Sequence, residues 1–210
     1  WDVLETHESF VEDQVRAEMM RQFGYFVTES TRHNAEYLPY FRCTPELCEQ
    51  YGVPPRDEVS MENVRKRSRM KDTGLDDEGE AEVPPLRASH EYASLIIEAR
   101  LAHDAFAFNG NVINHGSITN LPQNCCVEVP CVADAAGVRP TFVGDLPTQC
   151  AALNKTNINV QELAVEAVLR RDKEAAFHAC ALDPLTAAVV PLPQLREMFE
   201  ESCGLPKGRC

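Results

Sequence analysis

The sequence predicts an α+β fold, in which helices make up most of the chain and a small set of strands lies between them. The clearest helix covers residues 148–171, where leucine, isoleucine and valine recur at helical spacing with few helix breakers. Two β-like runs, residues 105–113 and 126–132, are joined by a turn rich in glycine, asparagine and proline, which predicts a pair of strands. Helices combined with a few strands are typical of the α+β class.

The first block of the chain, residues 1–53, is predicted to hold a helix, an extended run, a polar loop and a short helix, in this order: 8–21, 25–27, 28–34 and 45–50. Apolar residues recur along one face of the first helix, at Phe10, Val11, Val15, Met19 and Phe23. Gly24 is predicted to end that helix, and Thr44 is predicted to cap the start of the short one.

The later part of the chain contains further predicted elements besides the long helix and the strand pair. A helix is expected from Ser89, as its N-cap, to about His103. After the strand pair the sequence predicts a turn, a third strand and two more helices, in this order: 137–140, 141–143, 173–181 and 192–202. Asp183-Pro184 is expected to break the first of those two helices.

A charged insertion over residues 54–85 separates the first block from the rest. It has a Pro-Pro pair at each end and few large apolar residues, with a basic cluster at 65–71 and an acidic run at 76–80. Opposite charges so close in sequence are typical of a solvated, self-neutralising linker. We therefore expect an exposed helix and a mobile acidic loop here.

Composition excludes several classes of function. The net charge of −13 over 210 residues opposes binding to nucleic acid or to an anionic membrane, because their phosphates would be repelled. No apolar stretch approaches the ~20 residues that a membrane-spanning helix needs. Nine cysteines are an odd number, and none form a C-x-x-C pair. With no secretory signal at the start, this favours free thiols in a reducing cytoplasm.

Three segments are more specific than composition or periodicity explains. The first, residues 24–39, begins Gly-Tyr-Phe-Val-Thr-Glu-Ser. The second, residues 108–130, contains Phe-Asn-Gly-Asn-Val, Asn-Leu-Pro and Cys-Val-Glu-Val-Pro. The third, residues 144–188, contains Gly-Asp-Leu-Pro, Asn-Ile-Asn-Val-Gln-Glu-Leu and Asp-Pro-Leu-Thr-Ala-Ala. In order and spacing they resemble glycoside hydrolase family 4, most closely its α-galactosidase branch, from near residue 20 to the end.

The resemblance implies that the complete protein has two domains with different functions. Family members join an N-terminal Rossmann-type domain to a C-terminal α+β domain, as lactate and malate dehydrogenases do. They bind NAD and a divalent metal, usually Mn²⁺. This chain has no G-x-G-x-x-G fingerprint, and the family's metal-binding Cys and His lie upstream of its first residue. Residues 1–210 are therefore expected to be the C-terminal domain, with both cofactors bound mainly by the missing N-terminal part and none assigned to a residue here.

The reaction that the resemblance implies is hydrolysis of an α-galactoside by oxidation and elimination, an exception among glycosidases. NAD takes a hydride from carbon 3 of the sugar, and a base removes the proton from carbon 2. The glycosidic oxygen then leaves, water adds and the hydride returns, while the metal polarises the sugar oxygens. The complete protein is expected to be a homo-oligomer.

Candidate site residues lie mostly in the first segment. Glu29, in a polar loop after an extended run, is the first choice for the catalytic acid or base, with a surface or capping role as the alternative. Sugar contacts are expected from neighbouring polar residues and from two asparagines that flank Gly110 at a strand end: Ser30, His33, Asn34, Glu36, Tyr37, Asn109 and Asn111. Tyr37 could equally belong to the core, and the two asparagines to a turn.

Two other polar features have open interpretations. Glu128, between two valines, is expected to line the site or to be paired in the core. Asn157 and Asn159, early in the long helix, are expected to face the substrate or a partner subunit.

A second function class also fits the sequence. The chain could be a catalytically inactive domain, derived from the family, that serves interaction or oligomerisation. The sequence immediately upstream would distinguish the two, since a strand followed by a glycine-rich turn would indicate an active enzyme.

Overall fold

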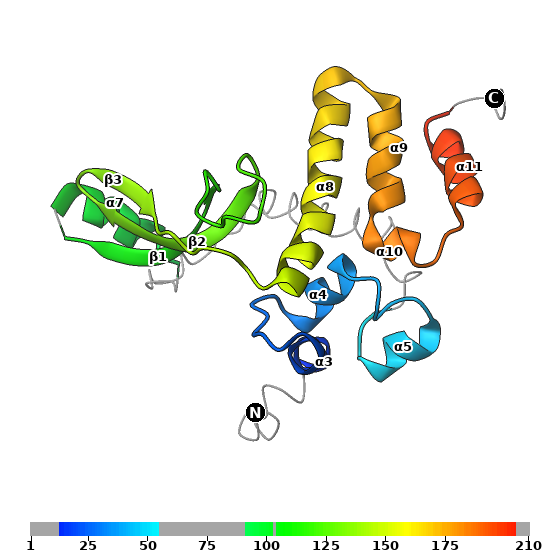
Figure 1. Ribbon diagram of the computed structural model, residues 1–210, viewed down its shortest axis with the longest axis horizontal. Helices are drawn as coiled ribbons and strands as arrows, with labels where there is room; N and C mark the ends of the chain where they lie inside the picture. The colour runs from blue at the N-terminus through cyan, green and yellow to red at the C-terminus, as the bar shows by residue number, and fades with distance from the viewer. Residues whose placement is uncertain (1–12, 55–90, 103, 205–210) are drawn as a thin grey trace, which may run out of the picture. The chain divides into compact units, whose positions relative to one another are not determined.

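A computed structural model describes residues 13–54, 91–102 and 104–204. The chain divides into two compact units, the first made of residues 1–59 and 147–210 and the second of residues 60–146. Figure 1 shows the helices and strands of both units. The predicted α+β class is confirmed, because the first unit is helical and the second holds a small sheet. Most of the charged insertion, and the predicted N-cap Ser89, lie outside the described residues.

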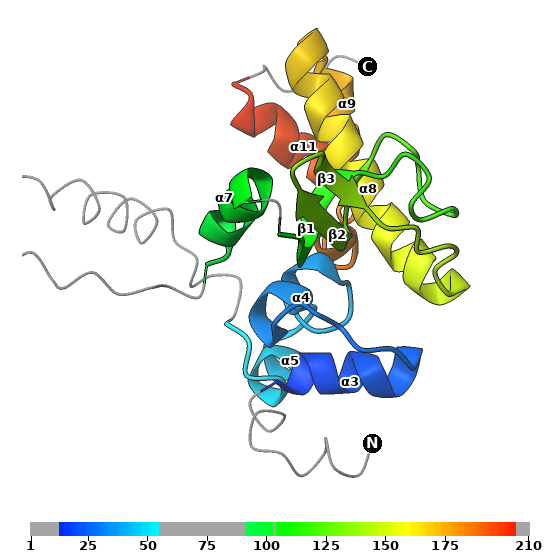
Figure 2. The same cartoon turned by 90° about the vertical axis from the view of Figure 1, so that its left-hand side faces the viewer.

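The first unit begins with three short helices: α3 (Gln14–Phe23), α4 (Thr31–Tyr37) and α5 (Pro45–Gln50). Gly24 ends α3 in the left-handed region, at φ 81°, which a residue without a Cβ adopts readily. Thr44 caps α5, as predicted, because its side chain accepts a hydrogen bond from the Leu47 amide. Figure 2 shows the three helices grouped together.

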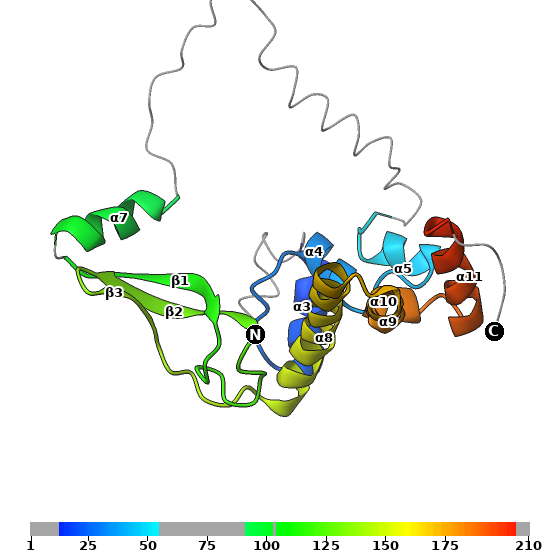
Figure 3. The same ribbon diagram turned by 90° about the horizontal axis from the view of Figure 1, so that it is seen from above.

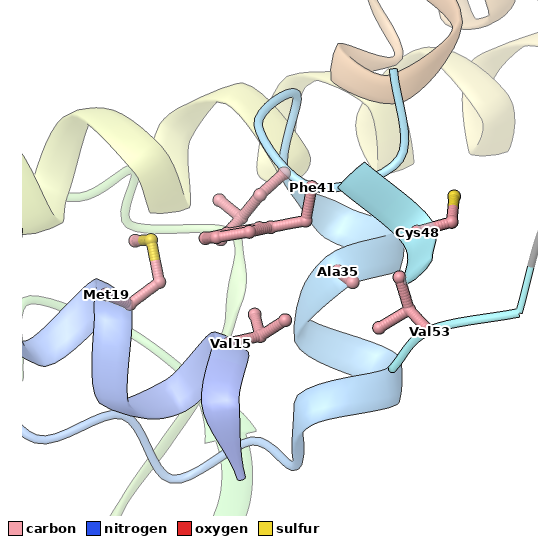
Figure 4. Close-up of a cluster of buried hydrophobic side chains, with 7 residues drawn as sticks. Val15, Met19, Ala35, Phe41, Cys48 and Val53 are labelled. Atoms are coloured by element: carbon pink, nitrogen blue, oxygen red, sulfur yellow. The ribbon is translucent and has the colours of Figure 1, made fainter. Parts of the chain in front are cut away.

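A buried apolar cluster holds these helices together (Figure 4). Its members come from all three helices and from the segments that connect them: Val15, Met19, Ala35, Leu38, Phe41, Cys48 and Val53. Phe41 also stacks edge-on against Tyr51, with ring centroids 4.8 Å apart. The predicted apolar face of the first helix is thus confirmed for Val15 and Met19, whereas Phe10 and Val11 lie outside the described residues.

Helix α4 corrects the predicted polar loop over residues 28–34. Thr31, Asn34 and Ala35, which share one helical face, are all buried, so packing favours a helix from residue 31 onwards. The first turn of α4 is supported by a distant residue, since Asp13 Oδ1 accepts a hydrogen bond of 3.2 Å from the Thr31 amide. Residues 25–27 form an irregular connection rather than a strand.

The rest of the first unit consists of α8 (Thr148–Arg170), α9 (Lys173–Leu182), α10 (Pro184–Ala187) and α11 (Leu192–Ser202). The bounds of α8, α9 and α11 confirm the predicted helices to within one residue, whereas the short helix α10, which follows the predicted break at Asp183-Pro184, was not predicted. Asp172 caps α9 by accepting hydrogen bonds from the amides of Glu174 and Ala175. Helices α8 and α9 lie side by side (Figure 1).

The expectation that the long helix is a core helix is wrong for much of its length. Only Ala151 and Ile158 are buried in α8. Val165, Val168 and Leu169 are 58%, 78% and 78% exposed. These three residues lie in the C-terminal third of α8 and stay exposed although α9 packs alongside the helix. Among the described helices, none is long and apolar enough to cross a bilayer.

The second unit contains α7 (Ala93–Ala102) and an antiparallel sheet of β1 (Phe106–Ile113), β2 (Cys126–Asp134) and β3 (Gly137–Pro140). Figure 3 shows α7 over one face of this sheet. Alternate residues of β2 are buried, which gives the sheet an apolar face: Val127, Val129, Cys131 and Ala133.

The third strand corrects the predicted turn at residues 137–140 and the strand predicted at 141–143. Asp134 Oδ1 accepts a hydrogen bond from the Ala136 amide, and its carboxylate also pairs with the guanidinium of Arg139. These contacts tighten the connection at residues 135–136, so the chain turns back earlier and residues 137–140 pair with β2. The arginine lowers the pKa of the Asp134 carboxyl.

Glu128 does not lie in the core. It is exposed on β2, directly across from Asn111 of β1. Because Val127 and Val129 occupy the buried face, the side chain between them must point to the opposite face.

A fully buried asparagine organises the connection between β1 and β2. Asn114 Oδ1 accepts a hydrogen bond of 2.7 Å from the Ile118 amide. Its Nδ2 lies within 2.9–3.2 Å of three carbonyl oxygens, those of Ile118, Leu121 and Pro122. One amide side chain thus replaces the backbone pairing that an irregular loop lacks.

Candidate functional site

A cavity of about 370 Å³ lies between the α3–α4 connection and the first half of α8. Three of the predicted site residues line it, namely Glu29, Asn34 and Tyr37. The opposite wall, on α8, adds amide side chains and a thiol: Cys150, Asn154, Asn157 and Gln161. Mostly apolar side chains complete the lining: Met19, Phe23, Tyr25, Phe26, Val27, Thr28, Leu38 and Leu153. Apolar walls with a few polar groups are typical of a small-molecule site.

Arg16 of α3 holds the segment that carries Glu29. Its Nε donates to the Glu29 carbonyl at 3.1 Å and its Nη2 donates to the Thr28 carbonyl at 3.3 Å. The third guanidinium nitrogen pairs with Asp13 Oδ2 at 2.6 Å. The same guanidinium lies 5.6 Å from the centre of the Phe26 ring, a cation–π contact. One side chain from α3 therefore positions the loop from residue 26 to residue 29.

The Glu29 side chain lines the cavity, and its Oε1 accepts a hydrogen bond of 2.8 Å from the Ser30 amide just before α4. This contact gives the carboxylate a defined position at the edge of the cavity. Its role as catalytic acid or base stays a prediction.

Asn34 is buried, with 6% of its surface exposed, and it lines the cavity. Its Nδ2 has no hydrogen-bond partner among the described residues. Leaving a buried donor unsatisfied costs about 1–3 kcal/mol, so such groups usually mark a place where a further partner binds.

Three other predicted residues lie close to the cavity in sequence but do not belong to its lining. Ser30 begins α4 as its N-cap residue. His33 Nδ1 lies 3.7 Å from Glu36 Oε2, and Glu36 Oε1 lies 3.5 Å from Nη1 of the buried Arg42. Glu36 therefore neutralises a buried cation. Sugar contacts by these three residues stay predictions.

Asn109 and Asn111 are exposed on β1 and belong to the second unit. The Asn109 carbonyl accepts a hydrogen bond of 2.9 Å from the Tyr92 hydroxyl, and Asn111 lies across from Glu128. They form part of a strand rather than a turn. Their contact with a sugar stays a prediction.

The sequence predicted only part of the side of the cavity that the α8 amides form. Asn157 lines the cavity, and its Nδ2 donates to the Tyr37 carbonyl at 3.3 Å, whereas Asn159 is exposed and does not line it. Asn154 and Gln161 were missed. The signal that could have found them is the spacing of three and four residues from Asn157, which places all three amides on one helical face.

The described residues contain no group of three or more His, Cys, Asp or Glu side chains that could hold a metal ion. Burial raises the pKa of the Cys150 thiol, which keeps it protonated at neutral pH and makes it a poor metal ligand. The eight described cysteines are all free thiols.

Comparisons with known proteins agree on one family. The profile of the family 4 glycosyl hydrolase C-terminal domain matches residues 2–186. An α-galactosidase of Bacillus subtilis (strain 168) is 44% identical over 195 residues, covering 90% of this chain and 44% of that protein. An α-galacturonidase of Thermoanaerobacterium saccharolyticum is 27% identical over 93% of this chain and 42% of its own length.

A solved structure shares the fold. The crystal structure of a 6-phospho-α-glucosidase from gut microorganisms, in complex with NAD and Mn²⁺, matches 95% of this chain and 46% of that one. The TM-score is 0.62 and the identity 20%. The chain thus spans less than half the length of the relatives it matches. The profile match covers most of the chain, and a curated relative is 44% identical to it. This chain therefore belongs to the family of the family 4 glycosyl hydrolase C-terminal domain.

Proposed function

We propose that this chain is the sugar-binding and acid–base part of an NAD- and Mn²⁺-dependent α-galactosidase. The observation that carries the proposal is the cavity that Glu29 and Asn34 both line, with Asn34 buried and its Nδ2 without a partner among the described residues. The 44% identity to an α-galactosidase supports the choice of sugar. When bound, NAD and Mn²⁺ would supply oxidation of the sugar and polarisation of its oxygens. In this proposal both are held mainly by residues outside this chain.

Each wall of the cavity has a role in this proposal. Glu29 would exchange a proton with the sugar, either at carbon 2 or at the leaving oxygen. Asn34 would donate its free N–H to a hydroxyl, which satisfies a donor that is otherwise buried without a partner. The apolar walls would exclude water from the bound ring. A homo-oligomeric state and a cytoplasmic location stay predictions.

A fusion enzyme tests the proposal. It joins this chain to the part of the Bacillus subtilis α-galactosidase that precedes the matching segment. We expect the fusion to hydrolyse an aryl α-galactoside only when NAD and Mn²⁺ are both added. The isolated chain should show neither activity nor micromolar NAD binding by calorimetry, because the cofactor sites lie elsewhere. A folded fusion that binds both cofactors and remains inactive would contradict the proposal.

One observation favours the alternative, an inactive interaction domain. The exposed Val165, Val168 and Leu169 lie three and four residues apart on one face of α8. Apolar faces of this kind can serve docking rather than chemistry. A folded, cofactor-bound but inactive fusion is the result that this reading predicts.

A further inference from the structure

The three amides of α8 share one face of the helix and line the same cavity as Glu29 and Asn34. Asn154, Asn157 and Gln161 are separated by three and four residues, so their side chains project from adjacent turns in the same direction. The surrounding lining is apolar. Asn154 and Gln161 are exposed, and the Nδ2 groups of Asn154 and Asn157 donate to carbonyls of their own unit, so the side-chain carbonyl oxygens of all three amides can accept hydrogen bonds from a ligand in the cavity.

The charged side chains of the cavity, like its polar ones, indicate which ligands it can bind. Glu29 is the only Asp or Glu in the lining, and no Lys, Arg or His among the described residues lines the cavity. A carboxylate or phosphate on the ligand would be repelled by Glu29 and would meet no cation on these walls. Amide side chains both donate and accept hydrogen bonds, which suits hydroxyl groups.

We infer that Asn154, Asn157 and Gln161 form a specificity wall, which binds hydroxyl groups of a neutral sugar and disfavours uronic acids and 6-phosphorylated sugars. The inference rests on the proposed function and adds the residues that set its substrate class. The unpartnered Nδ2 of Asn34, on the opposite side of the same cavity, is an independent sign that a hydrogen-bonding ligand is missing. A ring between the two walls would be bound by amides on both faces.

The test replaces one amide at a time in the fusion enzyme. Gln161→Leu is the primary variant, because Gln161 is exposed and its loss leaves the helix contacts of α8 intact. KM for a neutral aryl α-galactoside should rise about tenfold, as expected when a sugar hydroxyl loses a hydrogen bond. Gln161→Arg should raise kcat/KM for the matching α-galacturonide, relative to the galactoside, by about tenfold. Asn159→Leu and Asn159→Arg, on the same helix but outside the lining, serve as matched controls and should change neither quantity.

Asn157 needs a gentler change. Its Nδ2 also donates to the Tyr37 carbonyl at 3.3 Å and to the Leu153 carbonyl at 3.2 Å, so removing it can loosen the α4–α8 contact. Asn157→Gln keeps an amide with N–H donors for these carbonyls while moving it by one methylene, and it should raise KM for the galactoside. If any variant is misfolded by circular dichroism, the Asn154→Leu variant replaces it.

The outcomes separate this inference from the proposed function. A fusion that hydrolyses neither sugar with both cofactors present contradicts the proposed function. An active fusion whose Gln161 variants match the Asn159 controls overturns the specificity wall alone. Equal kcat/KM of the unaltered fusion for galactoside and galacturonide also overturns it. Raised KM for the galactoside with the predicted shift toward the galacturonide supports it.

Discussion

In the fusion enzyme, Glu29→Gln is expected to lower kcat by about 10²–10⁴-fold, the usual effect of removing an acid or base that works in the transition state. Glutamine keeps the shape and most of the hydrogen-bonding reach of glutamate, so the fold and the affinity for NAD should change little. Steady-state kinetics on an aryl α-galactoside, with both cofactors saturating, measures the change.

Glu36→Gln is a useful comparison, because Glu36 lies in the same segment but its carboxylate faces Arg42. The Arg42 side chain is buried and its Nη1 lies 3.5 Å from Glu36 Oε1. Neutralising Glu36 should therefore mainly lower the thermal midpoint, since a buried cation loses its partner. The loss of kcat should be smaller than for Glu29→Gln. Near-full turnover of Glu29→Gln would show that the assignment is wrong, and Tyr37, which also lines the cavity, would be next to test.

Asn114→Ala is expected to destabilise the second unit by about 3 kcal/mol. The reason is that the Ile118 amide would lose its acceptor in a buried place, at about 1–3 kcal/mol for an unsatisfied group, while the carbonyls that face Asn114 Nδ2 would each lose one donor. Hydrogen exchange of the β1–β2 amides, compared with the unaltered chain, would report the loss as faster exchange in that unit.

Gln123→Ala provides the control for this prediction. Gln123 lies in the same connection between β1 and β2, its side chain is exposed, and the loop uses its backbone carbonyl, which accepts a hydrogen bond from the His115 amide. Alanine keeps that carbonyl, so exchange rates should be unchanged. Equal protection in Asn114→Ala and Gln123→Ala would show that the Asn114 side chain does not hold this loop together.

Elements whose signals are local were predictable from sequence. Helix α5 carries its own cap at Thr44, and α8 and α11 have long apolar repeats with few breakers, so their bounds agree with expectation. The strand pair β1–β2 has β-branched and aromatic residues on either side of a glycine- and proline-rich turn.

Elements whose stability comes from distant residues were not predictable. The first turn of α4 depends on Asp13, eighteen residues before Thr31, and on burial of one face against the cluster around Val15. The third strand is a different case, because it depends on the local contact between Asp134 and Arg139, five residues apart. Neither the secondary-structure propensity of the residues nor the spacing of apolar positions predicts either contact.

The residues of the candidate site also divide into those that the sequence could predict and those that it could not. Glu29, Asn34 and Tyr37 could be named because their segment is specific in sequence, and the structure brings all three to one cavity. The facing amides could not be assigned with them, because Asn154 and Gln161 lie more than 110 residues further along the chain. Which face of α8 meets the cavity is decided by packing. Thr31 Oγ1 and Arg42 Nε are also buried without a partner among the described residues. This cavity does not account for them.

The central claim is that Glu29 and its cavity take part in an elimination from the sugar rather than a direct displacement. The most direct measurement is hydrolysis of an α-galactoside by the fusion enzyme in D₂O, followed by mass spectrometry and NMR of the released galactose. If a base removes the proton from carbon 2 and solvent exchange precedes its return, the product carries deuterium bound to carbon 2. Galactose with no carbon-bound deuterium, released at full rate without NAD, would contradict the account.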